Sequence, residues 1–351
     1  MKKLTLSCSL GTSAIFFGEL EDCWSRIESA AEAPLVTDNR VASFYPQLFR
    51  GRAHCVLPAG EKMKSLATAK KFYRQFLDWK LDRSSMVIGL GGGALCDLVG
   101  FAASTYLRGI NFLLVPTSLL AQVDAAVGGK TGINFAGLKN VIGTFALPRA
   151  TLIDVRFLLT LPREEILGGL AEVIKHGLIA SSELFSLVEK NWESILQKEL
   201  ELLEKIVFSS VQVKMTVVSE DVQEADTRRI LNFGHTFAHA LEKTRRISHG
   251  LAVAWGMAFA TRLSAHLGLL DQGEAQCILT FLHRVYPFLE RMEFSSSFLE
   301  KLFEKIQSDK KKTGDDISLV LLRRIGEAQV RRIPLKELRG VLRDLCQSGK
   351  H

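Results

Sequence analysis

Short apolar runs alternate with helical patterns in the first half of the chain. Residues 85–90 and 112–116 are nearly continuous apolar runs, whereas residues 64–80 and 94–105 have the spacing of helices. Strand, helix and strand joined by short connections are typical of a parallel sheet, whose strands are apolar throughout because both of their faces are buried. We therefore predict a Rossmann-like α/β domain with a parallel sheet over residues 1–161.

The pattern changes after about residue 162, where long helical periodicities replace the short runs. The predicted helices are residues 163–181, 182–197, 200–219, 230–245 and 251–267. Pro287 and Pro334 are the only prolines beyond Pro162, so few helix breakers interrupt this half. The stretch after residue 331 has the pattern of one further helix. We predict an all-α domain over residues 162–351.

Composition and charge narrow the classes of function. The 45 Lys and Arg residues exceed the 38 Asp and Glu residues by 7, and 47% of the residues are hydrophobic, as in globular proteins. The positive charge is evenly spread, so it favours an anionic small molecule and gives no specific support for a nucleic-acid partner. No apolar run reaches the roughly 18 residues of a membrane span. The six cysteines are scattered without a CxxC pair, which is typical of reduced thiols in a cytoplasmic protein.

A glycine cluster directly follows the apolar run at residues 85–90. Gly91, Gly92 and Gly93 open a predicted helix, and the free N–H groups and dipole of a helix start favour a phosphate. The glycines are contiguous, unlike the usual dinucleotide fingerprint, so a simple tight turn is the alternative interpretation. Asp38, at the end of an earlier predicted strand, could bind a ribose hydroxyl or act only as a cap or turn residue.

Three further segments place lysines beside glycines. The Gly-Gly-Lys loop at residues 128–130 is not a nucleotide-binding P-loop, because Asp124 stands where that motif needs glycine. Lys139 lies in a second glycine-bearing loop, and a run of lysines at residues 310–312 precedes a glycine turn. Such cations favour an anionic substrate, with solvated loop lysines as the alternative.

Histidine clustering points to a metal. His235, His239 and His249 are three of the eight histidines, and the first two share one face of a predicted helix, as in many zinc sites. Glu172 lies in an apolar stretch and needs a cation or a metal as partner, or it forms an ion pair with Lys175. Catalytic zinc usually has three protein ligands, so these four candidates leave the choice open. Separate, hydrogen-bonded histidines are the alternative.

Taken in order, these motifs resemble the 3-dehydroquinate synthase family of sugar-phosphate cyclases. The resemblance runs from about residue 38 to residue 325 and is carried by Gly91–Gly93 with Asp97, residues 101–109, 115–121, 128–131, 139–140, 170–175 and 231–236. Each motif is weak alone, whereas the ordered set is specific. The resemblance implies an N-terminal NAD-binding α/β domain, a helical metal-binding C-terminal domain, a site in the cleft and a homodimer.

The resemblance also implies the reaction. The substrate would be a sugar-acid phosphate, 3-deoxy-D-arabino-heptulosonate 7-phosphate, which the enzyme converts into 3-dehydroquinate and phosphate in the shikimate pathway towards chorismate and aromatic amino acids. NAD would oxidise the substrate transiently and be regenerated after β-elimination of phosphate, before an intramolecular aldol closure. Zn²⁺ or Co²⁺ would polarise the oxidised hydroxyl. We expect a cytoplasmic enzyme without a nucleic-acid or membrane partner.

Site residues are carried over position by position from the same resemblance. The metal ligands would be Glu172, His235 and His249, and His239 would lie on the substrate side instead. The substrate positions would be Asp124, Lys130, Asn140, Lys175, Lys214, Arg228, Asn232, His239 and Lys310, with Arg108 reaching the phosphate site of the partner subunit. The NAD positions would be Asp38, Glu61, Lys64, Gly91, Gly92, Gly93, Asp97, Thr117, Ser118, Lys130, Lys139, Asn140, Phe157, Thr160 and Leu161.

The chain departs from the family pattern in three places. Leu251 follows His249-Gly250 where the family usually has a glutamate, which would orient the zinc histidine and be worth about 10–100-fold in metal affinity or activity. Residues 225–227 stand where the family usually has a glycine-bearing loop, and Arg229 beside Arg228 leaves the register there open by one residue. The segment around Asp38 is shorter than in the family.

Three alternative functions remain: a cyclase for a different sugar phosphate, an NAD-dependent polyol dehydrogenase of a related class, and a catalytically inactive subunit. Arg228 and Lys214 favour a substrate with a carboxylate, because a substrate without one does not require this basic pair.

Overall fold

The computed structural model describes residues 1–351 except 28–29, 246, 292–295, 308–311, 314 and 349–351. Two compact units are formed, one by Met1–Gly169 with Lys198–Glu224 and the other by Leu170–Gln197 with Ala225–His351. The division predicted after residue 161 follows the sequence alone and stays a prediction. In space, the segment 198–224 belongs to the first unit although it follows that division.

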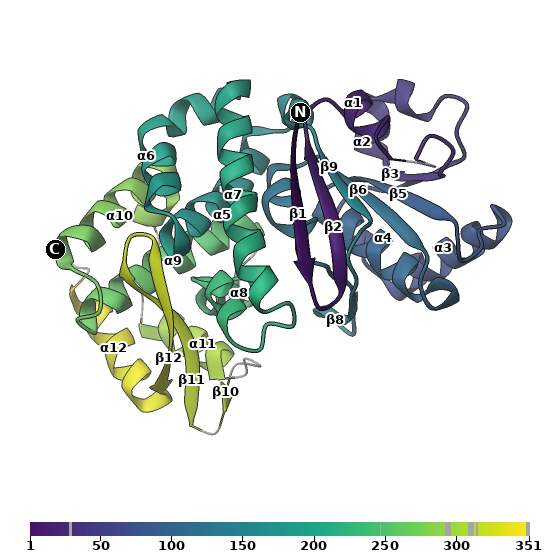
Figure 1. The fold of residues 1–351 in the computed structure, drawn as a ribbon. Helices are drawn as coiled ribbons and strands as arrows, with labels where there is room; N and C mark the ends of the chain where they lie inside the picture. Colours follow the sequence, from purple (N-terminus) through teal and green to yellow (C-terminus); the bar gives the residue numbers. More distant parts are fainter. Residues whose placement is uncertain (28–29, 246, 292–295, 308–311, 314, 349–351) are drawn as a thin grey trace. The chain divides into compact units, whose positions relative to one another are not determined.

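A seven-stranded sheet organises the first unit (Figure 1). Its strands are β1 (Lys2–Cys8), β2 (Gly11–Phe17), β3 (Leu35–Asp38), β4 (His54–Leu57), β5 (Met86–Gly91), β6 (Asn111–Pro116) and β9 (Ala150–Ile153). They lie in the order β1-β2-β9-β6-β5-β3-β4, and every neighbouring pair is parallel except β1 with β2. The predicted parallel α/β sheet is therefore confirmed, with an antiparallel hairpin at one edge.

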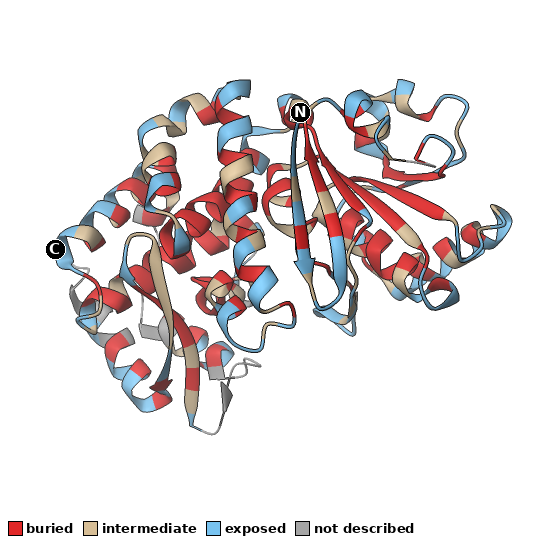
Figure 2. Ribbon diagram, viewed as in Figure 1, coloured by how far each residue is buried: buried red, intermediate tan, exposed pale blue. Residues whose placement is uncertain are grey.

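Both faces of this sheet are buried (Figure 2). Val87 of β5 packs into a cluster with α3 (Leu66–Asp78) and α4 (Gly93–Thr105). The next residue, Ile88, packs into a second cluster that includes side chains of α1 (Leu20–Trp24) and α2 (Asn39–Phe44). Successive strand residues point to opposite faces, so a strand covered on both sides is apolar at every position.

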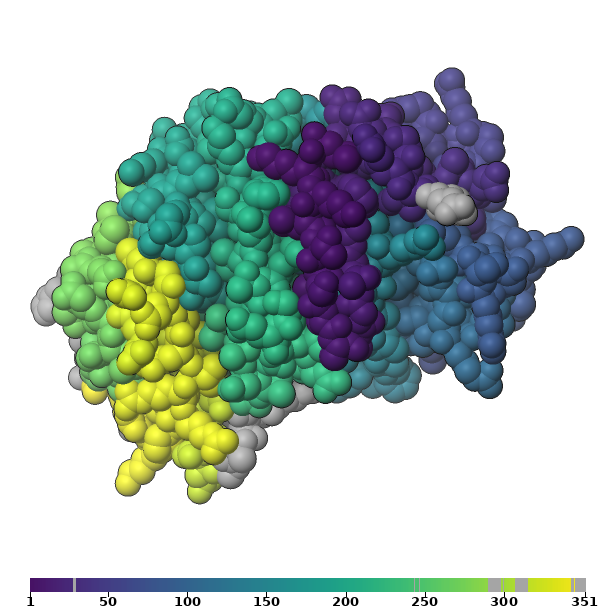
Figure 3. All heavy atoms as spheres, viewed as in Figure 1, coloured from purple at the N-terminus to yellow at the C-terminus, as the bar shows by residue number. Residues whose placement is uncertain are grey.

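The edge hairpin β1–β2 is covered by α7 (Leu200–Glu220), which comes late in the sequence. Phe208 of α7 meets Phe17 edge to face with ring centroids 5.0 Å apart, and Lys2 Nζ lies 4.8 Å from the centre of the Phe208 ring. The hairpin, purple in Figure 3, still lies at the molecular surface, as the exposed residues of β1 indicate. These contacts explain why residues 198–224 group with the first unit.

A second hairpin corrects the prediction of two glycine-bearing loops. Residues 130–145 form the antiparallel strands β7 (Lys130–Phe135) and β8 (Leu138–Phe145). Gly132 faces Gly143 across the pair, and a Cβ on Gly143 would lie 2.3 Å from the Thr131 carbonyl oxygen. These glycines therefore permit a close approach of two strands, whereas the sequence pattern alone indicated turns.

Short helical turns connect these elements. They are η1 (Pro46–Phe49), η2 (Glu61–Met63), η3 (Tyr106–Arg108), the π-helical η4 (Ala121–Ala125) and η5 (Val155–Thr160).

Helices dominate the second unit. They are α5 (Arg163–Ala180, which the chain enters from the first unit), α6 (Ser182–Leu196), η6 (Thr227–Asn232), α8 (His235–Thr244), α9 (His249–His266), α10 (Gln272–Val285), η7 (Pro287–Arg291), α11 (Ser296–Gln307) and α12 (Leu335–Ser348). The predicted helical character is confirmed. The single helix predicted at 230–245 is wrong in its first part, because Gly234 adopts a φ of 76° and separates η6 from α8.

The description of this domain as all-α also needs correction. An antiparallel sheet is formed by β10 (Lys312–Thr313), β11 (Asp316–Arg324) and β12 (Glu327–Pro334). Residues 317–322 of β11 are apolar and buried except for Ser318, and Gly326, with a φ of 87°, makes the turn into β12. An apolar run of this length next to a glycine turn indicates a strand.

No helix in the described part of the chain is long and apolar enough to span a bilayer.

Candidate active site

Three side chains of the second unit converge on one point. Glu172 lies in the middle of α5 and is fully buried, while His235 and His249 are the first residues of α8 and α9. The Nε2 atom of each histidine lies 3.7 Å from Oε1 of Glu172. One ligand atom from each of the three residues lies within 4.8 Å of the others. The interpretation as separate histidines is therefore wrong for His235 and His249.

A backbone contact between α8 and α9 places the two histidines. A Cβ on Gly256 would lie 2.1 Å from the carbonyl oxygen of Gly234, and a Cβ on Gly234 would lie 2.6 Å from the amide nitrogen of Met257. Only glycine allows so close an approach, and Gly234 also needs its left-handed φ of 76°. The glycine before His235 thus sets both the start of α8 and its distance from α9.

Each of the three side chains has a second partner. Lys175 Nζ forms an ion pair with Oε2 of Glu172, so the alternative ion pair predicted from the sequence is present as well. His235 Nδ1 lies 3.2 Å from the carbonyl oxygen of Phe233, and His249 Nδ1 lies 2.9 Å from Oε1 of Glu242.

The donor set fits a zinc-like cation. Neither oxygen of buried Glu172 accepts a hydrogen bond from the residues that the structure describes. One carboxylate with two imidazoles is a common ligand set of catalytic zinc, and ligands about 2.0–2.1 Å from a tetrahedral ion lie roughly 3.3–3.4 Å apart. The observed separations of 3.7 Å are close to this value.

His239 lies beside the trio, with its ring centroid 5.6 Å from that of His235 and 6.3 Å from that of His249.

Other predicted substrate residues of the second unit lie on η6. Arg228 is 2% exposed, whereas its neighbour Arg229 is exposed to solvent. Of the two adjacent arginines that could occupy the substrate-binding position, this difference in burial favours Arg228. Asn232, partly exposed, ends the same turn. Lys310 falls outside the described residues.

A connected polar cluster lies in the first unit. Lys64 is buried, and its Nζ donates to Oδ2 of Asp97 over 2.6 Å and contacts Oδ1 of Asn140. Asn134 connects this group to Glu61, because its Nδ2 donates to Oε1 of Glu61 (2.8 Å) and its Oδ1 accepts from the Asn140 backbone N–H (2.9 Å). Four predicted NAD residues are thus brought together by Asn134, which the sequence analysis did not single out.

Burial changes the acidity of one member of this cluster. It raises the pKa of the Asp97 carboxyl to about 6, and the positive charge of Lys64 opposes the rise. The carboxylate therefore depends on Lys64 to remain ionised near neutral pH.

The glycine turn leads from β5 into α4. A Cβ on Gly91 would lie 2.5 Å from Cδ2 of Leu95, so glycine permits the tight turn itself. Gly92 precedes the first residue of α4, Gly93. The Thr117 backbone N–H donates to the Gly91 carbonyl over 3.0 Å, and Ser118 Oγ lies 3.6 Å from where a Cβ of Gly92 would be. The structure thus brings Thr117 and Ser118 to the predicted phosphate turn.

Asp38 acts as a helix cap. Its Oδ1 accepts from the backbone N–H groups of Arg40 (2.9 Å) and Val41 (3.1 Å) and caps α2. This is the alternative role that the sequence indicated, and binding of a ribose hydroxyl by Asp38 stays a prediction.

The predicted NAD residues Phe157, Thr160 and Leu161 lie on or directly after η5. Phe157 packs against Tyr45 with ring centroids 4.8 Å apart, and the Tyr45 hydroxyl lies 3.2 Å from Thr160 Oγ1. Phe157 and Thr160, together with Arg156, line a cavity of about 370 Å³ in the first unit, whereas Leu161 does not.

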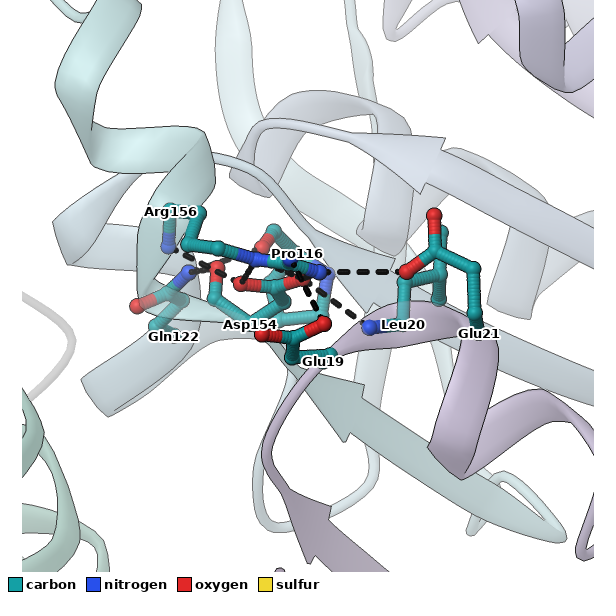
Figure 4. Close-up of polar contacts among 7 residues, drawn as sticks. All are labelled: Glu19, Leu20, Glu21, Pro116, Gln122, Asp154 and Arg156. Carbon is teal, nitrogen blue, oxygen red and sulfur yellow. Dashed lines mark hydrogen bonds and ion pairs between the residues drawn. The ribbon is translucent and has the colours of Figure 1, made fainter.

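Buried Asp154 holds the start of η5 (Figure 4). Its carboxylate accepts from the Leu20 backbone N–H over 2.9 Å and from the guanidinium of Arg156, whose Nη2 lies 2.6 Å from Oδ2. Gln122 Nε2 donates to the Asp154 carbonyl (2.9 Å) and to the Pro116 carbonyl (3.1 Å). This network links the turn η4 to η5, so both are fixed against the carboxyl end of β6.

Four predicted basic residues of the first unit differ in their surroundings. Lys214 on α7 is buried and its Nζ lies 2.5 Å from Oδ1 of Asp124. Lys130 opens β7 and forms an ion pair with Glu224. Lys139 and Arg108 are exposed, on β8 and η3 respectively.

Comparison with known proteins now decides the family. The family model of the 3-dehydroquinate synthase N-terminal domain matches residues 54–168, and that of the C-terminal domain matches residues 169–312. The chain belongs to the 3-dehydroquinate synthase family. The family resemblance inferred from the motifs is confirmed.

Curated relatives carry the name of this family, and solved structures of other enzymes share the fold. The 3-dehydroquinate synthase of Thermoanaerobacter pseudethanolicus is 41% identical over 82% of this chain and 81% of the relative, and that of Campylobacter concisus is 38% identical over 95% and 96%. A 2-deoxy-scyllo-inosose synthase in complex with carbaglucose-6-phosphate, NAD⁺ and Co²⁺ shares the fold, with a TM-score of 0.85, 23% identity and coverage of 98% and 99%. The 2-epi-5-epi-valiolone synthase of Streptomyces hygroscopicus, with NAD⁺ and Zn²⁺ bound, has a TM-score of 0.83, 27% identity and coverage of 96% and 97%.

Sequence reasoning missed three polar residues of this 3-dehydroquinate synthase family chain. Asn134 links two predicted NAD residues, Glu224 pairs with Lys130, and Glu242 contacts His249. Glu242 shares a predicted helix with His235 and His239, and an acidic residue on a histidine-bearing helix was the one available signal. The other two stand in segments that the sequence pattern described only as loops.

Proposed function

We propose that the protein is a 3-dehydroquinate synthase, which converts 3-deoxy-D-arabino-heptulosonate 7-phosphate into 3-dehydroquinate and phosphate in the shikimate pathway. The observation that carries this proposal is the convergence of Glu172, His235 and His249 in a chain that both domain models of the family match. The relatives at 38–41% identity are enzymes with this name.

The metal site is formed by the second unit. Zn²⁺ or Co²⁺ held by Glu172, His235 and His249 would act as a Lewis acid that lowers the pKa of a substrate hydroxyl and polarises the ketone formed from it. Lys175 balances the charge of Glu172 from the opposite side through its ion pair with Oε2. In the valiolone synthase and the inosose synthase, Zn²⁺ and Co²⁺ respectively accompany NAD⁺.

The NAD site is formed by the first unit. NAD would accept a hydride from the substrate and return it within the same turnover. The glycine turn before α4 offers backbone N–H groups to its phosphates, because a helix start carries unpaired donors and a partial positive charge. The cluster around Lys64 adds a buried cation and the amide of Asn140. The remaining proposed contacts are Asp38, Glu61, Gly91, Gly92, Gly93, Asp97, Thr117, Ser118, Lys130, Lys139, Phe157, Thr160 and Leu161.

The proposed substrate residues match the charges of the substrate. Arg228 would bind the carboxylate with two parallel hydrogen bonds, a geometry that its planar guanidinium supports. Cations and amides would hold the phosphate and stabilise the charge that develops as it leaves, namely Lys130, Asn140, His239, Lys310 and Arg108. Lys214 would add a second positive charge for the carboxylate, and Asp124, Lys175 and Asn232 would bind and orient the hydroxyl groups. Fixed orientation is the main requirement of the final ring closure.

A homodimer is part of the proposal. Leu107 and Arg108 are consecutive exposed residues with φ values of 50° and 67°, which is unfavourable for both side chains. Strain of this kind at a surface is typical of a functional contact, and an arginine presented to a second subunit would explain it. Sedimentation velocity of the purified chain measures the dimer directly, and a monomer at micromolar concentration would contradict it.

The cytoplasm is the proposed location. The five cysteines whose side chains the structure describes, Cys8, Cys23, Cys55, Cys96 and Cys277, are all free, which suits a reducing compartment.

A phosphate-release assay tests the proposed reaction. The purified chain is incubated with the heptulosonate phosphate, NAD and Zn²⁺, with and without a chelator, while absorbance of reduced nicotinamide is recorded. We expect phosphate release without net NADH, and its loss on chelation. Turnover of glucose 6-phosphate or sedoheptulose 7-phosphate alone would favour a different cyclase, and net NADH from a simple polyol would favour a dehydrogenase. If the chain binds no zinc and releases no phosphate, it is a catalytically inactive subunit.

A further inference from the structure

Glu242 and Glu172 lie at opposite nitrogens of the His249 ring. Oε1 of Glu242, in the last turn of α8, lies 2.9 Å from His249 Nδ1, while Oε1 of Glu172 lies 3.7 Å from His249 Nε2. The Glu242 side chain is 10% exposed, so its carboxylate is largely removed from water. A largely buried carboxylate needs such a partner, because burial without one is costly.

This contact selects one tautomer of His249. An ionised carboxylate can only accept hydrogen bonds, so His249 Nδ1 must carry the hydrogen and Nε2 of the neutral ring keeps its lone pair. His235 reaches the same state differently, because its Nδ1 faces the Phe233 carbonyl, which also only accepts. Both rings therefore have their Nε2 lone pair on the side of Glu172. A histidine that binds a metal through one ring nitrogen likewise donates its other ring N–H to a carboxylate or a backbone carbonyl.

The two histidines differ in how firmly they are held. The His235 side chain is 11% exposed and its partner is a backbone carbonyl, whereas the His249 side chain is 36% exposed and its partner is the movable side chain of Glu242. The orientation of His249 thus depends in part on a replaceable side chain. Leu251, the departure from the family pattern, does not leave His249 without a carboxylate partner.

We propose that Glu242 is a positioning residue of the metal site, which holds His249 through its Nδ1–H and so directs Nε2 towards the metal. The proposal rests on the proposed metal ligands Glu172, His235 and His249. Partners of this kind typically change metal affinity or activity about 10–100-fold.

The test measures zinc affinity of the full chain by competition with a chromogenic chelator. We expect Glu242→Ala to bind Zn²⁺ about 10–100-fold more weakly than the unchanged chain. Glu242→Gln keeps an oxygen that accepts from Nδ1–H, so it should recover most of this loss. Glu327→Gln serves as the control, because Glu327 is a partly exposed carboxylate of the same unit that pairs with Arg323 and Arg324, and the zinc affinity of this variant should not change.

Two further readouts separate positioning from a general effect on folding. The thermal midpoint of the chelated protein should be similar for Glu242→Gln and the unchanged chain, and the visible absorption of the Co²⁺-loaded protein should shift in Glu242→Ala only. If Glu242→Ala unfolds without metal, Glu242→Leu replaces it, because leucine fills a similar space but accepts no hydrogen bond from Nδ1–H, and the same weaker zinc binding and shifted Co²⁺ spectrum are expected relative to Glu242→Gln.

The outcomes distinguish this proposal from the proposed function. Unchanged zinc affinity and an unchanged Co²⁺ spectrum in both Glu242 variants, with one zinc bound by the unchanged chain, would overturn the role of Glu242 alone. If the unchanged chain binds no zinc, the metal site and the role of Glu242 both fail. Weaker zinc binding in Glu242→Ala, with recovery in Glu242→Gln, supports the proposal.

Discussion

The polar residues of the two units differ in what satisfies them. In the first unit, Lys64 contacts Asp97 and Asn140, and Asn134 links Asn140 to Glu61, so protein groups satisfy one another. In the second unit, Lys175 forms an ion pair with Oε2 of buried Glu172, whereas Oε1 accepts no hydrogen bond from the described residues, although two imidazole nitrogens lie 3.7 Å from it.

This difference indicates two kinds of binding. A ligand at the Lys64 cluster must exchange existing hydrogen bonds, and the net gain of such an exchange is only about 0.5–1.5 kcal/mol per bond. A metal ion at Glu172 coordinates the oxygen that Lys175 does not contact, and its binding free energy adds directly to the stability of the folded unit. We therefore expect the second unit to depend more on its metal than the first unit depends on NAD.

The largest expected effect comes from removing a metal ligand. His249→Ala takes away one of three converging ligand atoms, so the protein should lose its bound zinc and its activity. His239→Ala is the matched control, because His239 lies outside this trio, and it should keep zinc while phosphate handling weakens. Elemental analysis of both purified variants measures the difference. Equal zinc in the two would contradict the ligand assignment and the comparison built on it.

A smaller effect is expected from the contact that places the histidines. Gly256→Ala puts a Cβ 2.1 Å from the Gly234 carbonyl oxygen, so α8 and α9 must separate. We expect a loss of about 1–3 kcal/mol in the free energy of unfolding, as is usual for overpacking, together with weaker zinc binding. Urea unfolding with and without zinc measures both.

Gly340→Ala provides the control for this substitution. Gly340 lies in α12 of the same unit, and a Cβ there would meet nothing within 4 Å. Alanine in a helix is favoured over glycine by about 0.5–1 kcal/mol, so this variant should be slightly more stable. A Gly256→Ala protein as stable as Gly340→Ala would show that the contact does not constrain the site.

The smallest effect concerns the Lys64 cluster. Lys64→Met removes the cation that lowers the pKa of Asp97, so that pKa should rise further above its value of about 6. Carbon-13 NMR of labelled aspartates measures it. Asp82 is an internal control. Hydrogen bonds from Ser84 and Ser85 lower its pKa to about 2, and this value should not change in the variant. An unchanged Asp97 pKa would contradict the claim that Lys64 and Asp97 satisfy one another in the first unit.

The same group affects stability with a definite sign. Because the folded-state pKa of Asp97 lies above its ordinary value of 3.8, its stabilising contribution is fully present below about pH 4. That contribution is lost as the pH rises through about 6. The free energy of unfolding of the unchanged chain should therefore fall over this range relative to Asp97→Asn.

Much of the fold was predictable because its signals are local. The apolar run ending at Gly91 predicted β5, since a strand buried on both faces is apolar at every position. The glycines of residues 130–145 predict loops where the structure has two strands, because glycine spacing alone does not distinguish a turn from two closely paired strands. The apolar run 317–322 was likewise missed beneath the helical pattern around it.

The sequence by itself determined the family, through motifs whose order is specific, and it supplied four candidates for three metal positions. The family resemblance already implied Glu172, His235 and His249 as the ligands, but only the tertiary structure showed that these three converge and that Glu242 lies behind His249. The reason is physical. These groups come from α5, α8 and α9, and their separations depend on helix packing, which at Gly234 and Gly256 brings two backbones into direct contact. Residue spacing along one helix carries no information about that distance.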